Sequence, residues 1–365
     1  MRIQKPLLAA LALSLTLIVC AATRLRSSGL AIEGAGRVFG DSVPDLSGSE
    51  RAQFDAGYQL FIKVWKLSEG QQRSLNGNTC VACHMEPMPG GSGTASRTFV
   101  LISKRSTDAA GGHVFKRFIV NSTEEIPQRV PQQHTNRKTP SLFGLGLLEA
   151  VQAQDMVAVA TGTASLGWRG KTMSLYDFVE KAIAVELGLQ TPRFHQVVNE
   201  RRSTSTTPDQ HLDVSVAQIQ LMTQFIRLLG PPRPKNAEYM SLPGARIFEQ
   251  LGCSTCHTAV LVTGNSEIQA LRYKTISPFT DLRTHDMGPE LSDCEDESPP
   301  RCSRFRTSPL WGLSSTGPPF LHDGRAETLE RAIIAHGGEA QTSRNAYLAL
   351  NYADRELLQN FLNSL

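Results

Sequence analysis

Two short motifs in this sequence place cysteine and histidine side chains at a spacing that can do chemistry. In "NTCVACHME", Cys80 and Cys83 precede His84. The segment "GCSTCHT" repeats the pattern with Cys253, Cys256 and His257. Cysteines at this spacing serve zinc ribbons, redox dithiols or covalent haem attachment. These three uses differ in what they require of the surrounding sequence.

Haem attachment accounts for the histidine that follows each second cysteine. A zinc site could take four ligands from the two pairs, but it needs no histidine at that position. A redox dithiol would open a helix within a βαβ unit, and the sequence lacks the strand pattern of such a unit. In C-x-x-C-H, the cysteines form thioether bonds and the histidine reaches the iron. The sequence therefore predicts two covalently bound c-type haems, with His84 and His257 as proximal ligands.

The first residues of the chain have the layout of a secretory signal. Arg2 and Lys5 precede an apolar run over residues 7–19, and small residues follow it. The run is short for a membrane span, which needs about 20 residues. We expect a signal peptide over residues 1–22 and a periplasmic or otherwise exported protein. An uncleaved anchor, or a lipid on Cys20, is the alternative.

Composition limits the classes of partner. The chain has 40% hydrophobic and 19% charged residues and a net charge of +3, which are the values of a globular protein. Such a small net charge argues against nucleic acid, or a membrane beyond the N-terminal anchor, as the main partner.

Of the seven cysteines, Cys294 and Cys302 flank a short Pro-rich loop. In an oxidising compartment we expect these two to form a disulfide.

The chain reads as two copies of one unit. The segment "TPSLFGLGL" of the first half matches "TSPLWGLSS" of the second, and "GWRGKTMSLYDFV" matches "LHDGRAETLERAI". Each copy has a leading helix, a haem motif, a Pro-containing loop, a second helix and a closing helix. We expect a mostly α fold of two tandem c-type cytochrome domains with long loops, each wrapped around a covalent haem. The predicted parts are a linker at 23–50, an N-terminal domain at 51–232 and a C-terminal domain at 233–365.

From about residue 50 onward, the chain resembles the bacterial dihaem cytochrome c peroxidase superfamily. The segments "TPSLFGLGLLEA" and "HDGRAETLERAIIAHGGEA" resemble its dihaem oxidoreductase branch in particular. The resemblance implies an electron-entry haem in the C-terminal domain, which takes electrons from a small redox protein. It implies a reactive haem in the N-terminal domain, which splits peroxide. It also allows for a calcium ion between the domains.

The resemblance suggests distal ligands for both irons. His336 of "RAIIAHGGE" stands where the dihaem peroxidases usually have methionine, and His/His ligation would lower the potential relative to Met/His. Met287 of "THDMGPEL" is the competing ligand, and a surface role for His336 is the other alternative. His134 of "PQQHTNRK" is a candidate distal ligand of the N-terminal haem. If His134 is only a loop residue, that haem keeps an open position.

The resemblance also suggests a bridge and a catalytic acid. Trp168 of "GWRGK" takes the inter-haem position, although a core tryptophan is an equal alternative. Arg169 and Lys171 replace the Asp and Arg of the family pattern. Glu186 of "AVELGL" matches the glutamate that moves protons during peroxide cleavage, and a solvent-facing glutamate is its alternative. Glu149 of "GLLEA" is the second candidate for this role.

The function that the sequence predicts is that of an exported dihaem oxidoreductase. It would reduce hydrogen peroxide or a related small oxidant with electrons from the donor protein. The alternative is a dihaem electron-transfer cytochrome without catalysis, which would follow if both irons carried two protein ligands. The name thiol oxidoreductase finds no support, because haem would consume the thiols of both C-x-x-C pairs.

Overall fold

The computed structural model describes residues 39–66, 72–93, 98–121, 124–151, 166–172, 174–196, 212–235 and 238–365. The predicted signal peptide, Cys20 and most of the predicted linker lie outside these ranges. Residues 31–365 form one compact unit. The predicted boundary between residues 232 and 233 lies inside that unit and stays a prediction. Within the described ranges, every helix is too short or too polar to cross a membrane.

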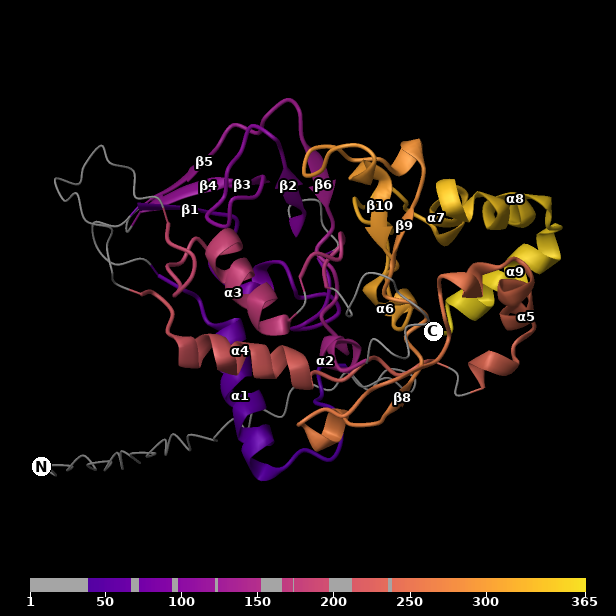
Figure 1. Ribbon diagram of the computed structural model, residues 1–365, viewed down its shortest axis with the longest axis horizontal. Helices are drawn as coiled ribbons and strands as arrows, with labels where there is room; N and C mark the ends of the chain where they lie inside the picture. The colour runs from indigo at the N-terminus through magenta and orange to yellow at the C-terminus, as the bar shows by residue number, and fades with distance from the viewer. Residues whose placement is uncertain are drawn as a thin grey trace, which may run out of the picture. The chain divides into compact units, whose positions relative to one another are not determined.

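In sequence, each half of the described chain begins and ends with a helix (Figure 1). The first half contains α1 (Gly48–Ile62), α2 (Leu145–Glu149), α3 (Leu175–Glu186) and α4 (Val216–Leu228). The second half contains α5 (Pro243–Gln250), α6 (Leu313–Thr316), α7 (Leu329–Ile334), α8 (Gln341–Ala349) and α9 (Tyr352–Leu362). Side-chain caps fix where several of them begin: Ser47 with Glu50 at α1, Ser174 at α3, and Thr328 at α7.

Short antiparallel strands add four small sheets in the described residues. One sheet has the order β1 (Gln72–Leu75), β4 (Phe118–Asn121), β5 (Glu125–Pro127), and another has the order β3 (Val114–Phe115), β2 (Val100–Ile102), β6 (Thr135–Arg137). The two-stranded sheets pair β7 (Leu261–Val262) with β8 (Thr275–Ile276), and β9 (Thr284–Asp286) with β10 (Arg304–Arg306). The fold is therefore a set of helices with small sheets. Strands this short leave no alternation for a sequence pattern to detect.

The predicted repeat is visible in how the terminal helices of each half pack. α1 lies against α4, and α5 lies against α9 (Figure 1). Both crossings are close because a glycine lies at the contact. A Cβ atom on Gly57 of α1 would lie 2.1 Å from the Leu221 carbonyl oxygen of α4. A Cβ atom on Gly244 of α5 would lie 2.1 Å from the Leu357 carbonyl oxygen of α9.

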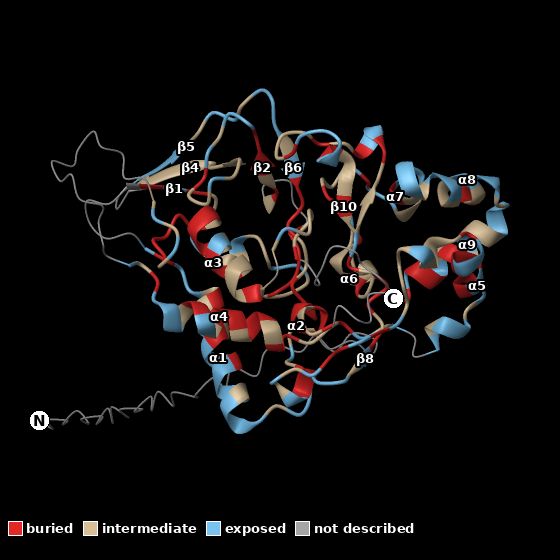
Figure 2. Cartoon of the chain, viewed as in Figure 1, coloured by how far each residue is buried: buried red, intermediate tan, exposed pale blue. Residues whose placement is uncertain are grey.

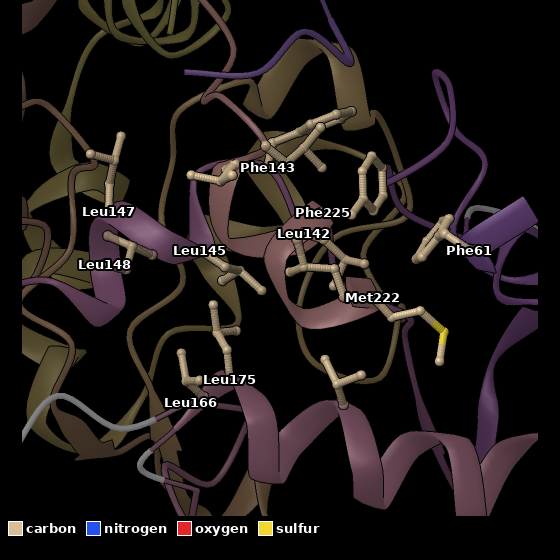
Figure 3. Packing of buried hydrophobic residues seen from close by; sticks show 14 of the residues in the cluster. Phe61, Leu142, Phe143, Leu145, Leu147, Leu148, Leu166, Leu175, Met222 and Phe225 are labelled. Atoms are coloured by element: carbon tan, nitrogen blue, oxygen red, sulfur yellow. The ribbon is translucent and has the colours of Figure 1, made fainter. Parts of the chain in front are cut away.

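The buried residues, red in Figure 2, include two hydrophobic core clusters. The larger cluster lies mainly in the first half and also takes in Leu261, Ala270, Leu271, Ile276 and Leu282, and the smaller lies in the second half. In the larger cluster, Phe61 of α1 and Phe225 of α4 have ring centroids 5.0 Å apart. Figure 3 shows these rings together with Met222 of α4 and side chains of the segment around α2. In the smaller cluster, Phe248 of α5 packs 5.4 Å from Phe361 of α9. Each crossing of helices thus carries an aromatic contact beside its glycine.

We predict that Gly57→Ala lowers the free energy of unfolding by about 2 kcal/mol, because the added methyl group overpacks the crossing of α1 with α4. Gly48→Ala is the matched control in the same helix, since a Cβ atom at Gly48 meets nothing within 4 Å. Chemical denaturation of both variants measures the difference. Equal stabilities would contradict the close crossing.

Candidate functional site

The first cysteine–histidine motif forms a tight turn after β1. Cys80–Ala82 make one turn of 3-10 helix, and the His84 amide donates to the Cys80 carbonyl oxygen at 3.0 Å. The Nδ1 atom of His84 hydrogen-bonds to the Gly91 carbonyl oxygen at 3.1 Å. Phe61 packs beside the imidazole with ring centroids 6.3 Å apart. This arrangement fixes the ring and directs its Nε2 atom away from the turn as the atom for a metal.

The second motif repeats this geometry in the other half. Cys253–Thr255 form the same 3-10 turn, and the His257 amide donates to the Cys253 carbonyl oxygen at 3.0 Å. The Nδ1 atom of His257 hydrogen-bonds to the Phe279 carbonyl oxygen at 2.9 Å. Phe248 of α5 takes the place of Phe61, with centroids 6.4 Å apart. The two motifs therefore offer equivalent imidazole ligands, which is what two haems of one type require.

The cysteines of both motifs are suited to haem attachment rather than to dithiol chemistry. All four have free thiols, whereas Cys294 and Cys302 form the predicted disulfide. Burial is the main cause that raises the pKa of the Cys83 thiol to about 11 and that of Cys253 to about 11. A redox dithiol needs the opposite shift, because its thiolate is the nucleophile.

Buried cations near the motifs also suit a haem. The Nζ atom of Lys116 and one terminal nitrogen of Arg306 are buried and lack a hydrogen-bond acceptor among the described residues. Burial lowers the pKa of Arg306 to about 10. Haem carries two propionate carboxylates, which are the acceptors that such cations require. The free thiols, the oriented histidines and these cations together fit two haems.

His336 lies near His257 and keeps its Nε2 atom available. The Nδ1 atom of His336, at the end of α7, hydrogen-bonds to the Ala332 carbonyl oxygen at 2.7 Å. Burial first, and then a smaller contribution from the His336 charge, lowers the pKa of His257 to about 4. The two imidazoles are therefore electrostatic neighbours. With each Nδ1 atom bonded to a carbonyl oxygen, the Nε2 atoms of both residues would be the ones to hold the iron of a haem attached at the second motif.

Of two other residues in this region, His285 is less suited to ligation, and Met287 stays the competing candidate. Met287 is half-buried beside Gly337, and its amide donates to the Ser303 carbonyl oxygen at 2.9 Å. His285 has both ring nitrogens engaged, by Asp281 at 2.7 Å and by Glu339 at 2.7 Å. Hydrogen bonds with Asp281 first, then with Cys256 and then with Glu339 raise the pKa of His285 to about 10. The possible ligand atoms of Cys256, Asp281 and His285 all lie within 4.8 Å of one another. However, a doubly hydrogen-bonded imidazolium has no lone pair for a metal.

Glu186 lies beside the first motif, at the end of α3. After burial, its negative charge is the main cause that raises the pKa of the Cys83 thiol. The Oε2 atom of Glu186 accepts a hydrogen bond from the Asn76 side-chain amide at 2.7 Å. The Glu186 carbonyl oxygen accepts the Asn76 amide at 2.8 Å. The turn that leads into Cys80 therefore holds both the main chain and the carboxylate of this glutamate.

The two remaining candidates of the first half lie in other surroundings. His134 is exposed, with its Nδ1 atom bonded to the Pro131 carbonyl oxygen at 2.8 Å, and it lines an open cleft of about 780 Å³ with the "HDGR" segment. Glu149 pairs with Arg227 at 2.7 Å and accepts the Leu175 amide at 2.7 Å. Glu149 is thus occupied in fastening α3 to α4, and Glu186 is the better placed of the two glutamates.

Trp168 lies at the junction of the two halves. Its indole Nε1 atom donates to the Lys138 carbonyl oxygen at 2.9 Å. Its own carbonyl oxygen accepts the Arg306 amide from β10 at 2.8 Å. The Lys138 amide in turn donates to the His322 carbonyl oxygen at 2.8 Å. Each half therefore donates one main-chain hydrogen bond to the other at this point.

His322 is a residue of the junction that the sequence reasoning missed. The bridges Leu166–Thr172 and Phe320–Ala326 enclose equivalent turns, and His322 has the place in its turn that Trp168 has in the other. The two rings meet edge to face, with centroids 6.4 Å apart. Burial, helped by the charges of nearby arginines, lowers the pKa of His322 well below its usual value, so the ring is neutral. The match between "GWRGK" and "LHDGR" was the signal that could have revealed it.

The C-terminal part of the chain matches a known family. Residues 197–365 match the family model described as "Di-haem oxidoreductase, putative peroxidase". The match confirms the resemblance inferred from the sequence and supports a dihaem oxidoreductase with haem cofactors. A search of curated proteins found no match.

Two solved structures are similar to this chain. One is hydrazine synthase of Kuenenia stuttgartiensis, with 15% sequence identity, a TM-score of 0.48 and coverage of 89% of this chain and 90% of that one. The other is a MauG-like protein associated with microbial copper homeostasis, with 14% identity, a TM-score of 0.44 and coverage of 89% and 92%.

We predict that each C-x-x-C pair carries one haem. The double variants Cys80→Ala/Cys83→Ala and Cys253→Ala/Cys256→Ala should each lose one covalent haem of two, because each motif supplies its own thioether bonds. Intact-protein mass spectrometry and the haemochrome spectrum measure the stoichiometry. The matched control, Cys294→Ser/Cys302→Ser, should retain both haems, and a wild-type protein without two covalent haems would contradict the assignment.

Proposed function

We propose that this chain is an exported dihaem c-type cytochrome that reduces hydrogen peroxide or a related oxidant with electrons from a small redox protein. The observation that carries the proposal is that Trp168 lies where the two halves meet, that each half has one haem-type motif, and that Glu186 lies beside the first of these motifs. The family match supports the oxidoreductase class. Peroxide as the substrate and a protein as the donor are our inference.

The two motifs receive different roles in this proposal. In the C-terminal half, the Nδ1 atoms of His257 and His336 are both bonded to carbonyl oxygens, so two Nε2 atoms would be ligands of one haem, which suits electron transfer without substrate binding. In the N-terminal half, His84 supplies one ligand and Glu186 lies nearby, which suits a site with an open position. When bound, the haems would supply electron storage and the cleavage of the O–O bond.

Glu186 is the residue that we assign to proton transfer. Reductive cleavage of peroxide requires a proton to leave the oxygen that binds first and to reach the oxygen that departs. Asn76 holds the Oε2 atom of Glu186, so the Oε1 atom is assigned to carry the proton. The hydrogen bonds from Asn76 also orient the carboxylate, because they fix both its main chain and its side chain.

Trp168 is the residue that we assign to the electron path. Its indole is fixed by Lys138 on one side and meets His322 edge-on at the other. The Trp168 main chain is bound to β10 of the second half. A ring held at the contact of both halves offers a polarisable path between the two sites, and a fixed ring costs no rearrangement when an electron passes.

Export is the part of the proposal that draws on the N-terminal layout and on the disulfide. Cys294 and Cys302 are paired, and such bonds persist in oxidising compartments. Haem of the c type is attached outside the cytoplasm, so a periplasmic location suits both features.

We predict that Glu186→Gln lowers peroxide turnover by about 10²- to 10⁴-fold, because the amide cannot carry the proton. Haem content and the ferric spectrum should be unchanged. Glu125→Gln, at an exposed position on β5, is the control and should keep full turnover. Two low-spin haems at every oxidation state, without peroxide turnover in the wild type, would contradict the peroxidase and favour the electron carrier.

We predict that His336→Ala converts one haem from low-spin to high-spin, because it removes the imidazole that would be the second protein ligand of the haem attached at Cys253 and Cys256. Met287→Leu tests the competing ligand and should leave both spin states as in the wild type. Electron paramagnetic resonance of the ferric proteins gives the readout. The reverse pattern would assign the ligand to Met287.

A further inference from the structure

A short acidic loop of the second half binds the first half through residues before and after Cys294. Residues 293–302 include Asp293, Glu295, Asp296 and Glu297, with Cys294 bonded to Cys302 across the loop. Each of these acids has a partner in the first half. Their partners are Arg137 for Asp293 and Asp296, the Lys104 amide for Glu295, Arg169 for Asp296, and Lys171 for Glu297.

Arg169 also binds main-chain carbonyl oxygens in and next to the loop. Its side chain is only 7% exposed, and a terminal nitrogen lies 2.7 Å from the Asp296 carboxylate. The same guanidinium donates to the carbonyl oxygens of Asp293 at 2.6 Å, Cys302 at 2.9 Å and Arg304 at 2.8 Å. A buried guanidinium needs acceptors for all of its donors, and the loop provides nearly all of them.

The contacts of Arg169 extend to Trp168, its neighbour in the chain. The guanidinium lies over the Phe305 ring at 4.0 Å from the centroid. Phe305 stacks on His322 with centroids 3.7 Å apart, and His322 meets Trp168 edge-on. Trp168 is thus held in two ways. Arg169, the next residue, fixes its main chain, and Phe305 and His322 pack toward the edge of its ring.

The segment that carries Trp168 needs such support. Gly167 and Gly170 flank Trp168 and Arg169, and both have positive φ angles, of 79° and 60°. Glycine gives the chain more conformational freedom than any other residue. The turn that contains these two glycines therefore does not fix the indole by itself. The equivalent turn of the second half has Asp323 at the place of Arg169, so the charge in the first half is reversed, and the acidic loop supplies its complement.

We propose that the disulfide-closed loop 293–302 is the clamp that positions Trp168, with Arg169 and Asp296 as positioning residues for the electron path between the two halves. The inference rests on the proposed function, since it concerns the path assigned to Trp168. The disulfide contributes by limiting the freedom of the loop that presents Asp296 and the carbonyl oxygens. Opening the disulfide therefore loosens the same contacts as removing the carboxylate.

The charge state of Asp296 is compatible with a clamp that works throughout the neutral range. Burial alone would raise the pKa of Asp296, but the Arg169 hydrogen bond and the charges of Arg137, Arg169 and Lys171 lower it below its usual value. A lowered pKa keeps the carboxylate ionised, and its stabilising contribution is lost only as the pH falls through that lowered pKa.

The test compares Asp296→Ala with Asp296→Glu and with Cys294→Ser/Cys302→Ser in the dihaem protein. Hydrogen exchange of the peptide that covers residues 166–172 reports the clamp without any substrate. We expect exchange to rise about tenfold or more in Asp296→Ala, the factor for losing a charge-assisted hydrogen bond, and to fall back in Asp296→Glu. The double cysteine variant should also exchange faster. Ser298→Ala is the control, because its side chain is exposed in the same loop.

The rate of electron transfer between the two haems, measured after flash reduction of one of them, is the second readout. We expect it to fall in Asp296→Ala and to recover in Asp296→Glu, with haem content unchanged. Unchanged exchange at residues 166–172 in both Asp296→Ala and the double cysteine variant would overturn the clamp. Faster exchange with an unchanged transfer rate would overturn the positioning role if Trp168→Phe slows transfer. If Trp168→Phe is also without effect, the electron path of the proposed function fails, while the faster exchange still supports the clamp.

Discussion

Two reciprocal main-chain hydrogen bonds join the two halves at Trp168 and His322, and the rest of the junction is built around them. Lys138 donates to His322, and Arg306 donates to Trp168, each at 2.8 Å. Lys138 and Arg306 have equivalent places before the matched "SLFGL" and "PLWGL" segments, as Trp168 and His322 have in their turns. The two bonds are therefore copies of one interaction. Because both run through the main chain, their geometry tolerates different side chains at the same positions.

Charge compensation across this junction is asymmetric. The first half contributes Arg137, Arg169 and Lys171, and the loop of the second half contributes the acids. Burying such charges is costly unless each is paired and hydrogen-bonded, and here one loop does both with carboxylates and carbonyl oxygens. The disulfide is the covalent part of this compensation, since it keeps the acceptors of one loop together.

The sequence predicted those features that depend on residue identity at fixed spacing. The C-x-x-C-H motifs, the disulfide between Cys294 and Cys302 and the repeated segments could all be read without coordinates, and the family match over residues 197–365 confirmed the resemblance. The placement of Glu186 beside Cys83, by contrast, depends on the hydrogen bonds of Asn76, which no local pattern encodes. His322 was within a quoted motif, but its contact with Trp168 arises only when two segments far apart in the sequence meet. The short strands were missed because two to four residues carry no period.

The equivalence of Trp168 and His322 shows what a repeat within one chain allows that two identical subunits do not. In a symmetric homodimer, a residue on the two-fold axis faces its own copy, so any substitution there changes both sides of the contact at once. Joining two such subunits in one chain removes that restriction. One position can then hold an indole and the other an imidazole, as they do here with ring centroids 6.4 Å apart. Tandem fusion thus permits an unequal contact where two equivalent turns meet, and it likewise permits the charges on the two sides of the junction to differ.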